Sequence, residues 1–205
     1  HPSPNKKYKP TVVFVHHMWG SHRTTWRHYR YLNDKGFDCV TFNLLMGSAH
    51  KKFSWHPDLK YFYKGVFYIW TRQIRSVLDS IEGDKIVFAF SGPSLSALWA
   101  SHGRDDILKV IVDGGPFHQI YENTRNFFAQ EVGIKKPLPN KIAAYLGSAI
   151  WGVKPLDKLH KVLRVWPQSV PILSIRGVMD DIVDINSIRE VFAKHPKLNL
   201  TELEL

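Results

Sequence analysis

The sequence predicts an α/β protein with a mostly parallel, doubly wound sheet of about six strands. Short apolar stretches alternate with amphipathic ones from one end of the chain to the other. Several apolar stretches are continuous, which is typical of parallel strands buried on both faces. At 205 residues the chain can bury a sizeable core, and we expect a single domain over residues 1–205.

Each expected strand is a run rich in β-branched and other apolar residues. In chain order, the runs are Thr11–Val15, Phe37–Leu44, Ile86–Phe90, Val110–Asp113, Val170–Ile175 and Leu198–Leu205. Because ligands of open α/β sheets bind beyond the carboxyl ends of the strands, we expect the functional residues there.

Helices are expected where apolar residues recur every three or four positions and a glycine marks the end. These segments are Thr24–Lys35, Phe62–Ile81, Pro93–His102 and Ile185–Lys194. Gly36, Gly83 and Gly103 follow the first three. A polar loop that contains His and Lys is expected between the second strand and about Pro57.

The segment from about 114 to 168 is too long for a single crossover, and we expect it to form a small helical cap inserted over the sheet. Its helical patches are Gln119–Gln130, Asn140–Ile150 and Leu156–Leu163, broken by Pro137, Pro139 and Pro155. Six aromatic residues in it suggest an apolar pocket: Phe117, Tyr121, Phe127, Phe128, Tyr145 and Trp151.

The composition excludes some function classes. No apolar run approaches the roughly 20 residues of a membrane span, so a soluble protein is expected. The net charge is +10, but the basic residues are scattered and no nucleic-acid-binding motif accompanies them, so we expect no nucleic acid partner. The single Cys39 cannot form an internal disulfide, which favours a cytoplasmic location without excluding another. The oligomeric state stays open.

The stretch from Ile86 to Ala97 carries the strongest functional signal. An apolar strand enters Ser91-Gly92-Pro93 and a helix of small residues follows at once. This layout is typical of a nucleophile elbow, a tight turn that presents a serine hydroxyl. Ser94 matches the pattern G-x-S-x-G more closely, but Pro93 is best accommodated in the first helical turn, which places Ser91 at the corner. A serine that merely caps the helix is the structural alternative.

The first strand runs into His16-His17-Met18-Trp19-Gly20. This loop resembles the His-Gly-x-Gly-Gly loop of the α/β-hydrolase superfamily, in which backbone N–H groups stabilise an oxyanion. The resemblance implies that Met18 donates one N–H group and Gly92 the other, although His17 and Trp19 stand where the family has glycine. The nearby histidines lack the spacing and carboxylates of a metal site, and no metal or organic cofactor is expected.

The fifth strand leads into Gly177-Val178-Met179-Asp180-Asp181. This segment resembles the one that carries the acidic triad residue of the superfamily, and the match falls on Asp180. A strand-end aspartate can also serve only as a turn or cap residue. The resemblance implies that Asp180 orients a histidine base.

The histidine itself is not visible where the superfamily has it, because the chain ends with the last expected strand. Three explanations stay open: the sequence is truncated at Leu205, which we favour; another histidine (His16, His17 or His118) substitutes; or the protein is catalytically inactive. His102, His160 and His195 are expected at helix ends or on the surface.

Together these features predict a serine hydrolase that cleaves a carboxylic ester-type bond through an acyl-enzyme, with a small, hydrophobic acyl substrate. The alternative from another class is a catalytically inactive binding protein on the same fold. A third hypothesis is binding to an anionic surface, driven by the net charge of +10.

Overall fold

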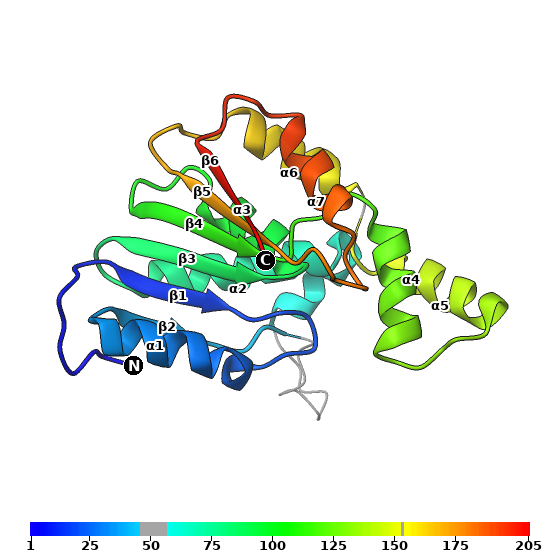
Figure 1. Cartoon of the computed structure of the whole chain (residues 1–205), viewed down its shortest axis with the longest axis horizontal. Coiled ribbons are helices and arrows are strands. Elements are labelled where there is room, and N and C mark those ends of the chain that lie inside the picture. Colours follow the sequence, from blue (N-terminus) through cyan, green and yellow to red (C-terminus); the bar gives the residue numbers. More distant parts are fainter. Residues whose placement is uncertain (46–56, 153) are drawn as a thin grey trace.

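The computed structural model describes residues 1–45, 57–152 and 154–205. All strands of its single sheet run parallel, in the order β2-β1-β3-β4-β5-β6 (Figure 1). The strands are β1 (Thr11–Val15), β2 (Asp38–Thr41), β3 (Lys85–Phe90), β4 (Ile107–Asp113), β5 (Ile172–Arg176) and β6 (Leu200–Glu204). The predicted parallel, doubly wound sheet of six strands is confirmed.

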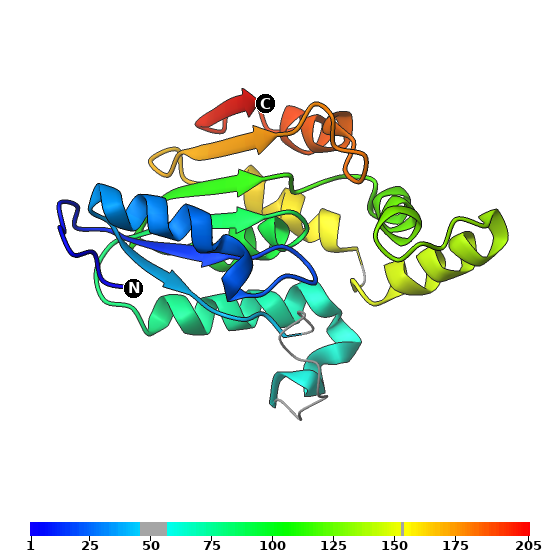
Figure 2. The ribbon, with the colours of Figure 1, turned by 60° about the horizontal axis from the view of Figure 1, so that its bottom comes forward.

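Helices cover both faces of the sheet (Figures 1 and 2). The α-helices are α1 (Trp26–Lys35), α2 (Val66–Asp79), α3 (Pro93–Ser101), α4 (Ile120–Gln130), α5 (Pro137–Ala149), α6 (Pro155–Arg164) and α7 (Ile185–Ala193). Short 3-10 helices, η1 (His22–Thr25) and η2 (Pro57–Lys64), precede α1 and α2. Helix α1 packs on one face of the sheet, and α2, α3, α6 and α7 pack on the other.

Strand β3 lies in the middle of the core, and its alternate side chains face opposite layers. Val87 and Ala89 are fully buried beneath α2 and α3. Phe88, on the other face, stacks on Phe14 of β1 with ring centroids 5.4 Å apart. Burial on both faces explains the continuous apolar run of this strand, and it holds the carboxyl end of β3 rigidly.

The helix predicted over Phe62–Ile81 begins later than expected, and this prediction was wrong in its first turn. Gly65, with φ of +91°, separates η2 from α2. A Cβ atom at residue 65 would overlap the backbone of Gly152, so the close approach of these two segments requires glycine. The predicted polar loop before Pro57 lies mostly outside the described residues.

The cap prolines were expected to separate the helical patches, and the structure places them at the starts of the helices. Pro137 and Pro155 are each the first residue of a helix, and Pro139 lies in the first turn of α5. A proline is tolerated there because the first turn leaves its N–H groups without helical partners. Helix α5 is therefore one turn longer at its start than the sequence suggested. In both views, α4 and α5 project beyond the edge of the sheet (Figures 1 and 2).

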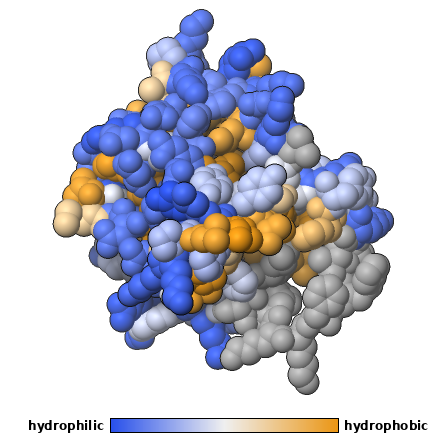
Figure 3. All heavy atoms as spheres, turned by 90° about the vertical axis from the view of Figure 1, so that its right-hand side faces the viewer, coloured by the Kyte–Doolittle hydropathy of each residue, from blue (hydrophilic) through white to orange (hydrophobic). Residues whose placement is uncertain are grey.

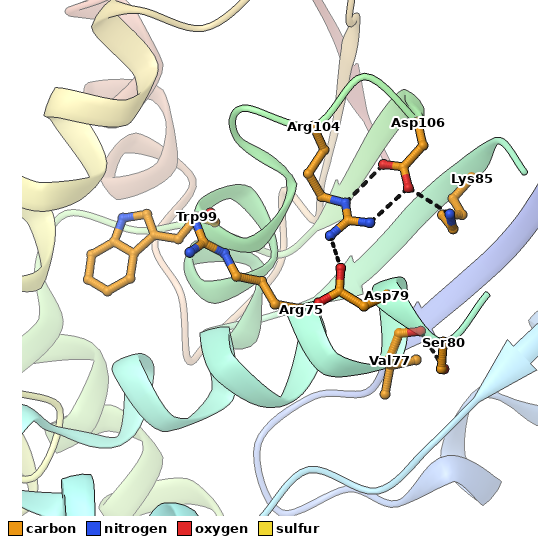
Figure 4. Close-up of polar contacts among 8 residues, drawn as sticks. All are labelled: Arg75, Val77, Asp79, Ser80, Lys85, Trp99, Arg104 and Asp106. Carbon is orange, nitrogen blue, oxygen red and sulfur yellow. Dashed lines mark hydrogen bonds and ion pairs between the residues drawn. The ribbon is translucent and has the colours of Figure 1, made fainter. Parts of the chain in front are cut away.

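An ion-pair network lies where β3 and β4 begin (Figure 4). Asp106 accepts hydrogen bonds from Arg104 Nε (2.9 Å) and Nη2 (2.8 Å) and from the buried Lys85 Nζ (2.7 Å). Arg104 also pairs with Asp79 of α2. The Arg104 guanidinium and Lys85 hold the pKa of Asp106 well below its usual range. The network ties together the ends of two strands and a helix, opposite the strand ends where Ser91 lies.

No helix in the described part of the chain is long and apolar enough to cross a membrane.

Candidate active site

Ser91 lies at the corner between β3 and α3. Its φ of +55° is in the left-handed region, which is costly for a residue with a Cβ atom. Its N–H donates to the carbonyl oxygen of Asp113 at the end of β4 (2.7 Å), and Pro93 follows as the first residue of α3. The sharp turn therefore combines a strained serine with the amino terminus of a helix, whose dipole favours negative charge.

The two candidate serines lie in different environments. Ser94 is completely buried, and its hydroxyl donates to the carbonyl oxygen of Ala89 (3.2 Å). Ser91 is partly exposed and lines the main cavity, and its hydroxyl has no hydrogen-bond partner among the described residues. In this geometry Ser91 can meet a ligand and Ser94 cannot.

The backbone around the corner is closely packed. A Cβ atom at Gly115 would overlap the carbonyl oxygen of Ser91, so glycine is required at that position. The same carbonyl accepts the N–H of Ser94 (3.0 Å). The loop after β4 thus supports the corner from one side and the first turn of α3 from the other.

Hydrogen bonds from histidines shape the loop after β1. The buried His16 accepts the N–H of Leu44 at Nε2 (2.9 Å), so its Nδ1 carries the proton and donates to the carbonyl oxygen of His17 (2.7 Å). That same carbonyl accepts the N–H of Gly20 (3.0 Å). Trp19 has φ of +63°, in the left-handed region that glycine favours. The backbone therefore turns where the sequence offers no glycine.

Two N–H groups are free near Ser91. Neither the N–H of Met18 nor that of Gly92 donates a hydrogen bond to another residue that the structure describes. Both residues line the same cavity as Ser91. Unpaired backbone donors beside a serine hydroxyl are the arrangement that stabilises an oxyanion.

The cavity has a volume of about 590 Å³, within the range typical of small-molecule sites. Its walls are mainly aromatic: Trp19, Phe67, Trp70, Phe117, Phe127 and Trp151 line it. Of the six cap aromatics expected at a pocket, Phe117, Phe127 and Trp151 line the cavity. The other three lie outside its lining: Tyr121, Phe128, which packs on Gly147, and Tyr145, which is exposed. Phe67 and Trp70 of α2 complete it, and the sequence analysis missed them because their spacing is that of ordinary core residues.

Asp180 lies in the loop after β5. One of its carboxylate oxygens accepts the N–H groups of Ile182 (2.8 Å) and Val183 (2.9 Å), and both of those residues line the cavity. Asp180 itself is exposed and outside the lining. The neighbouring Asp181 is exposed as well. Asp180 thus shapes the wall of the cavity through its turn, at the same strand edge as Ser91.

Asp113 is a further acidic residue at this edge, and the sequence analysis did not select it. It ends β4, directly beside Phe90 in the register of the sheet. Burial raises the pKa of Asp113, the charge of Asp180 raises it further, and His28 opposes the change. The sequence could have indicated Asp113 by its position at the end of β4, the strand next to β3, which carries Ser91 at its end.

The candidate histidines differ in the groups that they contact. His17 lines the cavity, whereas both ring nitrogens of the buried His16 are engaged. The Nδ1 of His118 pairs with Glu190 of α7 (3.2 Å). No described histidine hydrogen-bonds the Ser91 hydroxyl. Among the described residues, no group of three or more His, Cys, Asp or Glu side chains could hold a metal ion.

The other histidines include one unexpected pair. His160 of α6 and His195, just after α7, share a hydrogen bond between Nδ1 and Nε2 (2.8 Å). The second ring nitrogen of His160 is buried and has no hydrogen-bond partner among the described residues. Burial lowers the pKa of both rings. The expectation of an ordinary surface position for His160 was therefore wrong.

No protein-family model and no curated protein sequence matches the chain. Solved structures do resemble it. A monoacylglycerol lipase of Paleococcus ferrophilus matches 98% of this chain and 86% of its own, with a TM-score of 0.60 and 14% identity. An esterase of Pyrococcus furiosus matches 95% of this chain and 72% of its own (TM-score 0.61, 15% identity). An E-2-(acetamidomethylene)succinate hydrolase matches 97% and 84% (TM-score 0.65, 14% identity).

Proposed function

The chain has the α/β-hydrolase fold, and we propose that it is a serine hydrolase that cleaves carboxylic ester-type bonds. The strained, partly exposed Ser91 in an aromatic cavity is the observation that carries the proposal. The backbone N–H groups of Met18 and Gly92 support it, because two free donors flank the same cavity.

In the proposed reaction, Ser91 Oγ attacks the acyl carbonyl while its proton passes to a general base. The negative charge on the carbonyl oxygen is stabilised by the N–H groups of Met18 and Gly92, each donor being worth about 3 kcal/mol. The tetrahedral intermediate then expels the alcohol, which takes the proton from the base. Water hydrolyses the acyl-enzyme, and free Ser91 is restored. Asp180 orients the base by accepting its ring N–H.

The aromatic walls favour an ester with a hydrophobic acyl or alcohol part, since burying each CH₂ group contributes about 0.8 kcal/mol. We therefore expect kcat/KM to rise with acyl chain length until the cavity is filled. Truncation of the wall by Trp151→Ala, which enlarges the cavity, should shift the preferred length upward.

Labelling with a fluorophosphonate probe, followed by peptide mapping, tests the nucleophile. An adduct on Ser91 that is lost in Ser91→Ala and kept in the matched Ser94→Ala supports the proposal. An adduct on Ser94 would move the nucleophile and refute this assignment. Among the described histidines, His17 lines the cavity, and His17→Ala tests it: if the variant is still labelled, His17 is not the base.

The second candidate function is ligand binding without catalysis. It is favoured by the absence, among the described residues, of a histidine on the Ser91 hydroxyl. In that case a folded protein stays unlabelled by the probe while it still binds hydrophobic acyl compounds in the cavity. Fluorescence quenching of the aromatic walls by such a ligand would report that binding.

A further inference from the structure

Helix α5 turns an apolar face to solvent. Leu138, Ile142, Tyr145 and Leu146 are each between 54% and 72% exposed. Their spacing (i, i+4, i+7, i+8) places them in one stripe along the helix. Helix α5 is the outermost element on its side of the molecule (Figures 1 and 2). Figure 3 views that side and shows a band of hydrophobic residues across it. Contiguous exposed apolar surface of this kind marks an interaction site.

The opposite face of α5 accounts for how the helix is held. Asn140 is buried and donates to the carbonyl oxygens of Arg125 (3.1 Å) and Ile134 (2.8 Å). Ala144 is also buried, and Gly147 lies against the ring of Phe128 in α4. Small and polar residues thus make the contact with the protein, and the large apolar ones face away. The usual amphipathic orientation is reversed.

Cationic side chains border the apolar stripe. A groove of about 330 Å³ between α4 and α5 is lined by Arg125, Lys135 and Lys141. Neither lysine has an ion-pair partner in the part of the chain that the structure describes, and Arg125 pairs with Glu122 (3.1 Å). In helical projection Lys141 flanks the stripe formed by the four apolar residues. The face therefore combines an apolar stripe with a basic border.

The lysines do not stabilise their own helix. Lys135 and Lys136 immediately precede α5, Lys141 follows in its second turn, and the first turn contains no acidic residue. Positive charge near a helix amino terminus opposes the helix dipole. Their placement is instead suited to a negatively charged partner.

We propose that α5 and the adjoining basic groove dock on the surface of an anionic phospholipid bilayer. The apolar stripe would enter the boundary between headgroups and acyl chains, as interfacial helices do. The phosphate groups would pair with Lys135, Lys141 and Arg125. The charge pattern favours this occupant over a second copy of the chain, because a two-fold contact centred on Ile142 would bring the Lys141 side chains of the two copies together. The net charge of +10 acts in the same direction.

Docking would bring the cavity close to the lipid. Val132, which is half exposed, lines the cavity and lies in the loop that joins α4 to α5. Trp19, also exposed, lines it from the loop after β1. If the proposed hydrolase function holds, on which this conclusion rests, the substrates are amphiphilic acyl esters embedded in a bilayer. The docking itself does not depend on catalysis.

Co-sedimentation of the full chain with vesicles tests the docking. We expect binding to vesicles that contain phosphatidylglycerol, weaker binding to pure phosphatidylcholine, and loss of binding with added salt. Lys135→Glu with Lys141→Glu should weaken binding by at least about tenfold. Replacing Leu138, Ile142 and Leu146 by serine should weaken it as strongly, and since these side chains are exposed, the fold should be kept.

Matched controls use exposed residues outside α4, α5 and the loop between them. Lys9→Glu with Lys197→Glu changes the net charge equally, and Tyr31→Ser with Val165→Ser removes exposed hydrophobic side chains. The docking proposal is refuted if the control variants weaken binding as much as the α5 variants do, or if the wild-type chain does not bind the anionic vesicles.

Self-association is the remaining outcome. A dimer that is dissolved by Ile142→Ser, in a chain that does not bind vesicles, would assign the face to a second copy and overturn the proposal. The two proposals fail separately. Vesicle binding without any ester hydrolysis would support the docking proposal and refute the proposed hydrolase function. Hydrolysis of soluble esters without vesicle binding would support the hydrolase function and refute docking.

Discussion

Replacing Ser91 by glycine should stabilise the protein, although glycine usually destabilises. The backbone at Ser91 has φ of +55°, and a residue with a Cβ atom adopts this region at a cost of about 1–2 kcal/mol. Glycine removes that cost, and since the Ser91 hydroxyl has no hydrogen-bond partner in the described chain, no contact is lost. The added freedom of glycine in the unfolded chain opposes the gain by about 0.5–1 kcal/mol.

The net expectation for Ser91→Gly is a free energy of unfolding higher by roughly 0.5–1 kcal/mol. Two variants bracket it. Ser91→Ala keeps the Cβ atom and should leave stability nearly unchanged. Ser94→Gly should lower the free energy of unfolding by about 1–2 kcal/mol, for two reasons. The folded protein loses the buried hydrogen bond to Ala89, and glycine gives the unfolded chain more backbone entropy.

Equilibrium unfolding in urea measures all three, with the slope of each transition checked for a two-state change. Reaction with the fluorophosphonate probe is followed in parallel, and Ser91→Gly should be unreactive. Stability gained together with reactivity lost is the signature of strain stored at a functional corner. The reasoning is refuted if Ser91→Gly lowers stability as much as Ser94→Gly does, because the corner would then carry no strain.

Three further outcomes are expected. Asp106→Asn should lower the free energy of unfolding by about 3 kcal/mol, because it leaves the buried Lys85 unpaired, and urea unfolding measures this. Burial raises the pKa of Cys39 to about 11, so a disulfide reagent at pH 8 should modify the native thiol at least about 100-fold more slowly than the unfolded one. Burial lowers the pKa of His160 and His195, so the unfolded state binds more protons below about pH 6.5 and stability should fall as the pH drops from 7 to 5.

Each of these outcomes has its own control. Asp79→Asn removes the exposed partner of Arg104 and should cost at most about 1 kcal/mol. An equal loss in both variants would contradict the argument from burial. If the reagent modified the native Cys39 thiol as fast as the unfolded one, the thiol would be accessible and the argument from its burial would be wrong. For the histidine pair, His195→Gln should flatten the pH dependence below pH 6.5, and an unchanged profile would mean that other groups cause it.

The fold could be predicted because its pattern is local. From Ile86 to Phe90 the run of β3 is apolar throughout, and glycines end the first helices, as at Gly36 with φ of +109°. The predicted boundary of a helix was wrong where a segment far away in the sequence determines it. Gly65 ends η2 because Gly152, far along the chain, approaches its backbone. The local sequence pattern does not contain that contact. The start of α5 was expected at Asn140 and lies at Pro137, although proline is favoured in a first helical turn.

The site was only partly predictable for a related reason. Ser91, Gly92 and Met18 lie at strand ends, where a parallel sheet gathers residues at one edge, so their proximity follows from topology. The position of Pro93 already favoured Ser91 over Ser94 at the corner, and the burial of Ser94, which the sequence does not contain, excludes its hydroxyl from the cavity. Phe67 reaches the cavity from a helix whose apolar face serves the core and the cavity at once.

The cap shows why an apolar stripe cannot be assigned from spacing alone. Helix α5 has the periodicity of a buried amphipathic helix, and Tyr145 was expected at the pocket as one of the aromatic residues of the cap. What decides the orientation is the polar side: Asn140 donates to the carbonyl oxygens of Arg125 in α4 and of Ile134 in the loop that follows, and Gly147 lies against the ring of Phe128. Once those contacts form, the apolar residues have no protein left to cover them. Such specific contacts expose the stripe, and the lysines beside it have no ion-pair partner in the described part of the chain. This combination indicates a partner outside the chain more strongly than the hydrophobicity of the stripe alone does.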